Sequence, residues 1–126
     1  MTSKLLTLVA GLALILMAVS LSAQDKTVTL DGYMIDNACA SSHAADPALD
    51  TVIKTHDTSC ALMDACEDSG YAVYANKKVY KFDAAGNTSA AEILKNTKSK
   101  KGLHVKVEGT IDGDTIKVTK MTEVTG

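Results

Sequence analysis

All three cysteines of the chain and two of its three histidines lie within residues 32–71. Cys39 and His43 are four positions apart, as are His56 and Cys60. In a helix that spacing places two side chains on one face, with their Cβ atoms about 5–6 Å apart. Thiolate and imidazole are ligands that zinc and copper prefer, and four such groups complete a tetrahedral zinc site. The sequence therefore predicts a zinc or copper site with the ligands Cys39, His43, His56, Cys60 and Cys66.

The same cysteines are also compatible with a disulfide. Cys60 and Cys66 are six positions apart, too distant to bond across a regular helix, because a disulfide needs its Cα atoms within about 7 Å. The pairs Cys39–Cys60 and Cys39–Cys66 both stay open, and either leaves one thiol free because three is an odd number. A third interpretation of the cysteines is thiol redox chemistry at Cys60, since His56 could lower the pKa of that thiol.

Motifs of catalysis and of cofactor binding are missing from the sequence. It contains no C-x-x-C-H haem motif, no phosphate-binding glycine loop and no nucleophile elbow. We therefore expect a metal-binding or metal-sensing protein that is not an enzyme. The alternatives are a disulfide-braced module for a peptide, glycan or envelope partner, and a thiol redox protein.

Residues 1–23 have the pattern of a secretory signal peptide. Lys4 precedes an apolar run over residues 5–19, and small residues lead to an expected cut after Ala23. The run is shorter than the roughly 20 residues that span a bilayer. The mature protein is thus expected to be periplasmic or secreted, with no stable membrane anchor, and residues 24–126 are enough for one small domain.

The charge pattern argues against nucleic acid as a partner. Residues 77–101 are rich in lysine, and Tyr74, Tyr80 and Phe82 are interleaved with them, as on faces that bind single strands. However, the chain has no arginine and a net charge of −2. We interpret the lysines as a solvated basic face, and the expected partner is a metal ion or a component of the cell envelope.

Alternation of apolar and polar residues predicts five strands. Residues 26–36 form the first, with a bulge or bend at Gly32. The other four form two hairpins, residues 71–83 around Asn76-Lys77 and residues 103–121 around Asp112-Gly113. Helical turns are expected over residues 46–56 and 58–67, and the capping box Ser89-Ala90-Ala91-Glu92 predicts a helix from Ser89 to about Thr97.

The order of these elements predicts a mainly β fold with two short helical segments, a five-stranded OB-fold-like barrel. A helix between the third and fourth of five strands is the arrangement of that fold. The Cys/His insertion, residues 37–70, then occupies the loop between strands one and two, where the fold commonly binds its ligands. The predicted metal site therefore lies in a loop suited to binding.

Four sequence blocks carry a resemblance to a known family. They are G-Y-M-I-D-x-x-C-A, H-x-x-x-C-A-L-M, C-x-x-S-G-Y and D-G-D-T-I-K-V. Together they resemble a family of small exported bacterial proteins of unknown function. The resemblance covers nearly all of the mature chain and implies an OB-like barrel outside the cytoplasm, with a Cys/His-rich first loop. It implies no activity.

Overall fold

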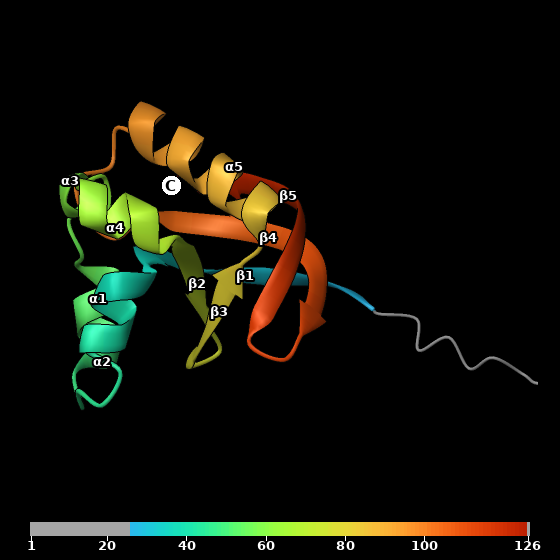
Figure 1. Cartoon of the computed structure of the whole chain (residues 1–126), viewed down its shortest axis with the longest axis horizontal. Helices are drawn as coiled ribbons and strands as arrows, with labels where there is room; N and C mark the ends of the chain where they lie inside the picture. The colour runs from blue at the N-terminus through green and yellow to red at the C-terminus, as the bar shows by residue number, and fades with distance from the viewer. Residues whose placement is uncertain (1–25, 126) are drawn as a thin grey trace, which may run out of the picture.

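The computed structural model describes residues 26–125, so the predicted signal peptide at residues 1–23 lies outside the described part. Five strands and five helices make up this part (Figure 1). The strands are β1 (Thr27–Asp36), β2 (Tyr71–Ala75), β3 (Lys78–Phe82), β4 (His104–Asp112) and β5 (Thr115–Glu123).

The five strands pair in the closed order β1-β2-β3-β5-β4, because β1 also pairs with β4. We call this arrangement the strand ring. All of its pairings are antiparallel except the short parallel contact of β3 with β5. The mainly β class predicted from the sequence is confirmed.

The helices are more numerous than the sequence predicts. The insertion between β1 and β2 contains four short helices: α1 (Asn37–Ser42), α2 (Leu49–Lys54), α3 (Thr58–Ala61) and α4 (Asp64–Ser69). With α5 (Ala84–Asn96) the described residues hold five helices, so the prediction of two helical segments is wrong. Turns between short helices rely on local capping, which periodicity detects poorly. Among residues 26–125, no helix has both the length and the apolar character to span a bilayer.

Gly32 allows β1 to pair with two neighbouring strands, β4 and β2. Residues 27–33 of β1 pair with β4, and residues 33–36 pair with β2. A Cβ atom at Gly32 would lie 2.1 Å from the carbonyl oxygen of Tyr74, so only glycine permits this approach of the two backbones. The predicted bend at Gly32 thus corresponds to the change of partner, without a bulge in the β1 pairing.

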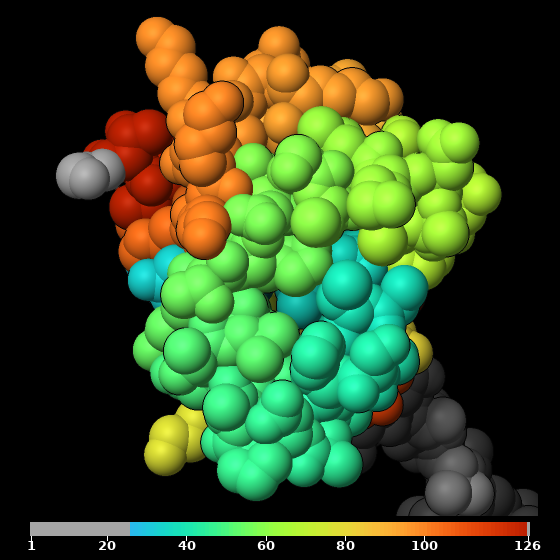
Figure 2. Space-filling model, turned by 90° about the vertical axis from the view of Figure 1, so that its left-hand side faces the viewer, coloured from blue at the N-terminus to red at the C-terminus, as the bar shows by residue number. Residues whose placement is uncertain are grey.

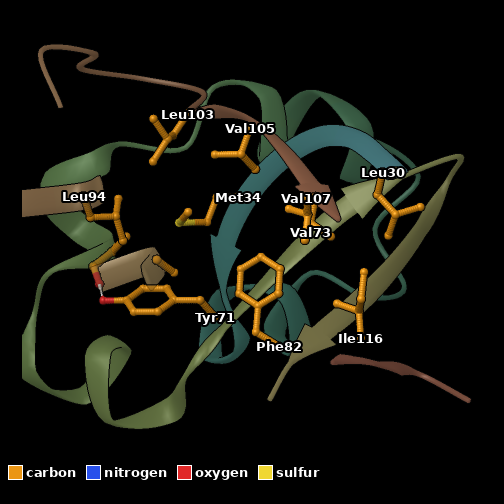
Figure 3. Packing of buried hydrophobic residues seen from close by; sticks show 13 residues of the cluster. Leu30, Met34, Tyr71, Val73, Phe82, Leu94, Leu103, Val105, Val107 and Ile116 are labelled. Carbon is orange, nitrogen blue, oxygen red and sulfur yellow. Dashed lines mark hydrogen bonds between the residues drawn. The ribbon is translucent and has the colours of Figure 1, made fainter. Parts of the chain in front are cut away.

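The main hydrophobic core fills the inside of the strand ring. Figure 3 shows Leu30, Val73, Val107 and Ile116, from four different strands, turned toward one another. Leu94 of α5 belongs to the same cluster, so α5 covers part of the ring. A second, smaller cluster lies on the outer side, where the insertion covers β1 and β2; it consists of Ile35, Ala40, Ile53, Ala72 and Tyr74.

Three predicted boundaries are wrong by a few residues. The helix predicted over residues 46–56 spans only Leu49–Lys54. The helix predicted from Ser89 begins at Ala84, because Asp83 caps it by accepting a hydrogen bond from the Gly86 N–H at 3.0 Å. The last hairpin turns at Gly113-Asp114 and not at Asp112-Gly113, since Asp112 already pairs with Thr115. The hairpin at Asn76-Lys77 is confirmed, and both of its turn residues have positive φ.

Candidate metal centre

Asp36 is the junction between the strand ring and the insertion. It ends β1, and its Oδ2 accepts a hydrogen bond from the backbone N–H of Cys39 at 2.8 Å, which caps α1. Aspartate is a favoured N-cap residue, so the sequence Asp36-Asn37-Ala38-Cys39 turns locally from strand to helix. The Asp36 side chain is nevertheless fully buried, which is rare for a carboxylate without a compensating partner.

Two thiols lie beside this carboxylate. A carboxylate oxygen of Asp36 and the Sγ atoms of Cys39 and Cys66 are all within 4.8 Å of one another. Cys39 belongs to α1 and Cys66 to α4. These three side chains could therefore hold a metal ion, since a carboxylate and two thiolates are three of the four ligands of a common zinc geometry.

Polar contacts hold α4 against α1 and so bring Cys66 to Cys39. The Asn37 side-chain amide donates to the Ser69 carbonyl at 2.9 Å, and the Ala38 N–H donates to Ser69 Oγ at 3.1 Å. The Asn37 N–H donates to the Gly70 carbonyl at 2.9 Å. Residues 37–38 are thereby tied to residues 69–70, and the two cysteines come together although they are distant in sequence.

The second carboxylate oxygen of Asp36 is unpartnered. Oδ1 is buried and has no hydrogen-bond partner among the described residues. The nearest basic group is Nε2 of His56, 3.4 Å away, which is too long for a good hydrogen bond. The His56 side chain is only 11% exposed. A buried acceptor without a partner costs about 1–3 kcal/mol, so the cluster is incomplete in its protein contacts alone.

The environment keeps both thiols protonated. Burial, followed by the charge and contact of Asp36, raises the pKa of Cys39 from 9.0 to about 12. Burial and the nearby Asp36 also raise the pKa of the Cys66 thiol. Because only the thiolate attacks electrophiles, neither residue is an activated nucleophile. A metal ion would have to displace the protons, and that makes its binding depend on pH.

The five ligands predicted from sequence do not form one group. Cys39 and Cys66 come together, and His56 reaches the group only through Asp36. Cys60 lies close enough to Cys66 to influence its pKa but outside the group of three. His43 lies apart, with its Nδ1 3.5 Å from Asp46 Oδ2 and its side chain 43% exposed.

Sequence reasoning missed Asp36. The available signal was the position of Asp36 three residues before Cys39. An acid at this spacing is typical of an N-cap residue that accepts a hydrogen bond from the first turn of its helix. That pattern indicates the hydrogen bond to Cys39 N–H, but it does not reveal the burial or the approach of α4. Figure 2 shows the insertion from outside, with a small hollow between its green and blue-green parts.

Comparisons with known protein families, with curated proteins and with solved structures find no match for this chain. The resemblance to small exported proteins therefore stays an expectation from the sequence.

Proposed function

We propose that this chain is an exported, non-catalytic metal-binding protein that takes one zinc ion through Asp36, Cys39 and Cys66. The observation that carries the proposal is the fully buried Asp36 carboxylate, which has one unpartnered oxygen and lies in a group with two thiols. A divalent cation would bond directly to the buried carboxylate, and because both thiols would lose their protons on binding, the net charge of the site would not change. A fourth ligand would come from Cys60, from His56 after rotation, or from water.

The ligand types favour zinc over copper(I). Zinc accepts carboxylate, thiolate and imidazole in one tetrahedral shell, whereas copper(I) favours sulfur ligands. Zinc bonds of about 2.0–2.3 Å place neighbouring ligand atoms about 3.5 Å apart. The three atoms would therefore have to draw together from their present spread of up to 4.8 Å. Copper(I) would instead recruit the third sulfur, that of Cys60.

His56 is proposed as a positioning residue. Its Nε2 lies 3.4 Å from Asp36 Oδ1. Carboxylates that bind a metal are commonly oriented by a hydrogen bond from a second group. Loss of such an outer partner typically weakens metal affinity about 10–100-fold. His56 would therefore matter for affinity even where it does not touch the ion.

The finer fold and the location belong to the same proposal. The closed order of the strands and the placement of α5 between β3 and β4 support an OB-like barrel. The metal site would then lie in an enlarged loop between β1 and β2. The signal-like pattern of residues 1–23 supports export to the periplasm or beyond.

Native mass spectrometry with a count of free thiols tests the metal assignment on protein freshly isolated from the envelope. We expect one bound zinc ion and three reduced cysteines. Asp36→Asn should lower the zinc affinity at least tenfold while keeping the cap of α1, because asparagine is an equally good N-cap. Asp57→Asn is the matched control, since Asp57 is an exposed acid of the insertion whose side chain makes no cap hydrogen bond.

A Cys39–Cys66 disulfide is the second candidate, favoured by the proximity of the two Sγ atoms. It would brace the insertion as part of a binding module and contribute about 3–4 kcal/mol. In that case the isolated protein would carry no metal, would have a mass two protons below the reduced form, and would show one free thiol. That combination would refute the zinc proposal.

A further inference from the structure

A second candidate binding site lies on the outer side of the strand ring, and no cysteine lines it. A cavity of about 340 Å³ opens between α1, α2 and the β2–β3 hairpin. Small-molecule sites commonly measure about 300–1,000 Å³, so the cavity lies at the small end of that range. Its walls come from three different elements, which makes it concave and not a flat patch.

The floor of this cavity is apolar. Ala40, Leu49, Tyr74 and Val79 line it, and all four belong to or pack against the second hydrophobic cluster. Tyr74 and Val79 are directly opposite each other on β2 and β3, so they present one continuous surface. The cavity is therefore the open margin of the cluster that holds the insertion on the strand ring.

The rim of the cavity is basic. Lys77, Lys78 and Lys81 line it together with a single acid, Asp114. Asp114 is 81% exposed and lies 4.0 Å from Lys78 Nζ, at the limit of an ion pair. Within residues 26–125, Lys77 and Lys81 form no ion pair. Two unpaired cations thus face a cavity with an apolar floor.

The position of Lys81 follows from the register. Lys81 is opposite Ala72, and Val79 is opposite Tyr74. Because alternate residues of a strand share a face, Val79 and Lys81 lie on the same outer face of β3. The lysine therefore stands at the end of the apolar floor, as required for a ligand with a charged head and an apolar tail.

We infer that this cavity binds a small organic anion with a short apolar tail, of the class of medium-chain carboxylates. The tail would cover Leu49, Tyr74 and Val79, and the carboxylate would lie between Lys77 and Lys81. No cysteine lines the cavity, so its ligand would not compete with the proposed metal for the thiols. Nucleic acid does not suit it, because the cavity is small and its floor is apolar.

Titration of ¹⁵N-labelled mature protein with octanoate, followed by backbone amide shifts, tests the inference. We expect saturable shifts confined to residues 40–49 and 74–81. Octylammonium, which has the same tail and the opposite charge, should cause none of them. Equal binding of octylammonium, or octanoate shifts that map to another face, would overturn the inference.

Two sets of variants sharpen the test. The double variant Lys77→Gln, Lys81→Gln should weaken octanoate binding about fivefold or more, since each exposed ion pair contributes a few-fold in affinity. The double variant Lys106→Gln, Lys120→Gln removes the same charge from exposed positions outside the cavity and should leave binding unchanged. Ala44→Leu, at an exposed cavity position, should obstruct the site without a core change. Undiminished binding by both cavity variants would also overturn the inference.

Discussion

The strand ring and the insertion are held together in different ways. The ring encloses a continuous apolar core to which all five strands and α5 contribute. The insertion (residues 37–70) contributes one buried residue, Ala61 of α3, to that core and helps to form a much smaller outer cluster, in which Ile53 of α2 is fully buried. Much of its remaining attachment is polar: the Thr58 hydroxyl donates to the Ser99 carbonyl at 2.8 Å, and the Gly102 N–H donates to the His56 carbonyl at 3.0 Å.

This difference indicates that the two regions respond to different perturbations. Burial of apolar area is the main stabilising term in folding, so the ring can fold on its core. The insertion supplies fewer buried apolar side chains than the ring and contains a buried carboxylate with an unpartnered oxygen. Segments with few apolar contacts open locally at lower free energy. A ligand at Asp36 should therefore act on the insertion more than on the ring.

The largest expected effect is on the ring. Ile116→Ala, at a fully buried position of β5, should lower the free energy of unfolding by about 3 kcal/mol, because it leaves a cavity in the core. Urea unfolding followed by circular dichroism measures this loss. Ile53→Ala, equally buried but in the insertion, should mainly reduce the hydrogen-exchange protection of residues 37–70. An equal loss of global stability in both variants would show that the two regions unfold as one unit.

Metal removal is expected to have the next largest effect, and to act on the insertion. Zinc at 100 times its dissociation constant stabilises the state that binds it by about 2.7 kcal/mol. Chelation should therefore increase hydrogen exchange in α1–α4 and leave β4 protected. A uniform increase across the whole domain would contradict the proposed division. A reductant without chelator serves as the control and should change nothing.

The hydrogen bond that attaches α3 should contribute about 1 kcal/mol to the free energy of local opening of this segment. Thr58→Val keeps the shape of the side chain but removes the hydroxyl that donates to the Ser99 carbonyl, and loss of one such bond costs about that much. Hydrogen exchange of residues 56–61 measures the effect. Thr119→Val is the matched control, because its hydroxyl donates to the Glu108 carbonyl from an exposed position and should matter little.

The last expected effect is absent at neutral pH and appears only in alkaline solution, where the stability of the metal-free protein should depend on pH. The pKa of Cys39 rises from 9.0 to about 12 on folding, so above pH 9 the unfolded chain loses its thiol proton before the folded one does. Stability is therefore unaffected below about pH 9 and should fall as pH rises from 9 toward 12. Thermal unfolding under a phosphine reductant measures the slope. Cys39→Ser should flatten it, and an unchanged slope would argue against the burial of this thiol.

Local patterns were sufficient for the strands and for one turn. The alternation of residues 103–107 agrees with the burial of Leu103, Val105 and Val107, because successive side chains of a strand point to opposite faces. The turn at Asn76-Lys77 followed from the gap between two β-branched runs. The predicted start of α5 was wrong, because Asp83 and Ser89 are both favoured N-cap residues. Asp83 accepts a hydrogen bond from the Gly86 N–H and another from the Val118 N–H of β5 at 3.1 Å, and the second is a long-range contact that the local sequence does not reveal.

For the candidate site, the sequence by itself determined which side chains carry soft-metal chemistry and that most of them lie in the first loop. Spacing describes neighbours within one helix, so it paired Cys39 with His43 and His56 with Cys60. Only the tertiary structure decided that Cys39 faces Cys66 across two helices and that Asp36 lies buried beside both. The physical reason is that these contacts depend on how Ser69 and Gly70 hold α4 against α1, a long-range packing that no local period records.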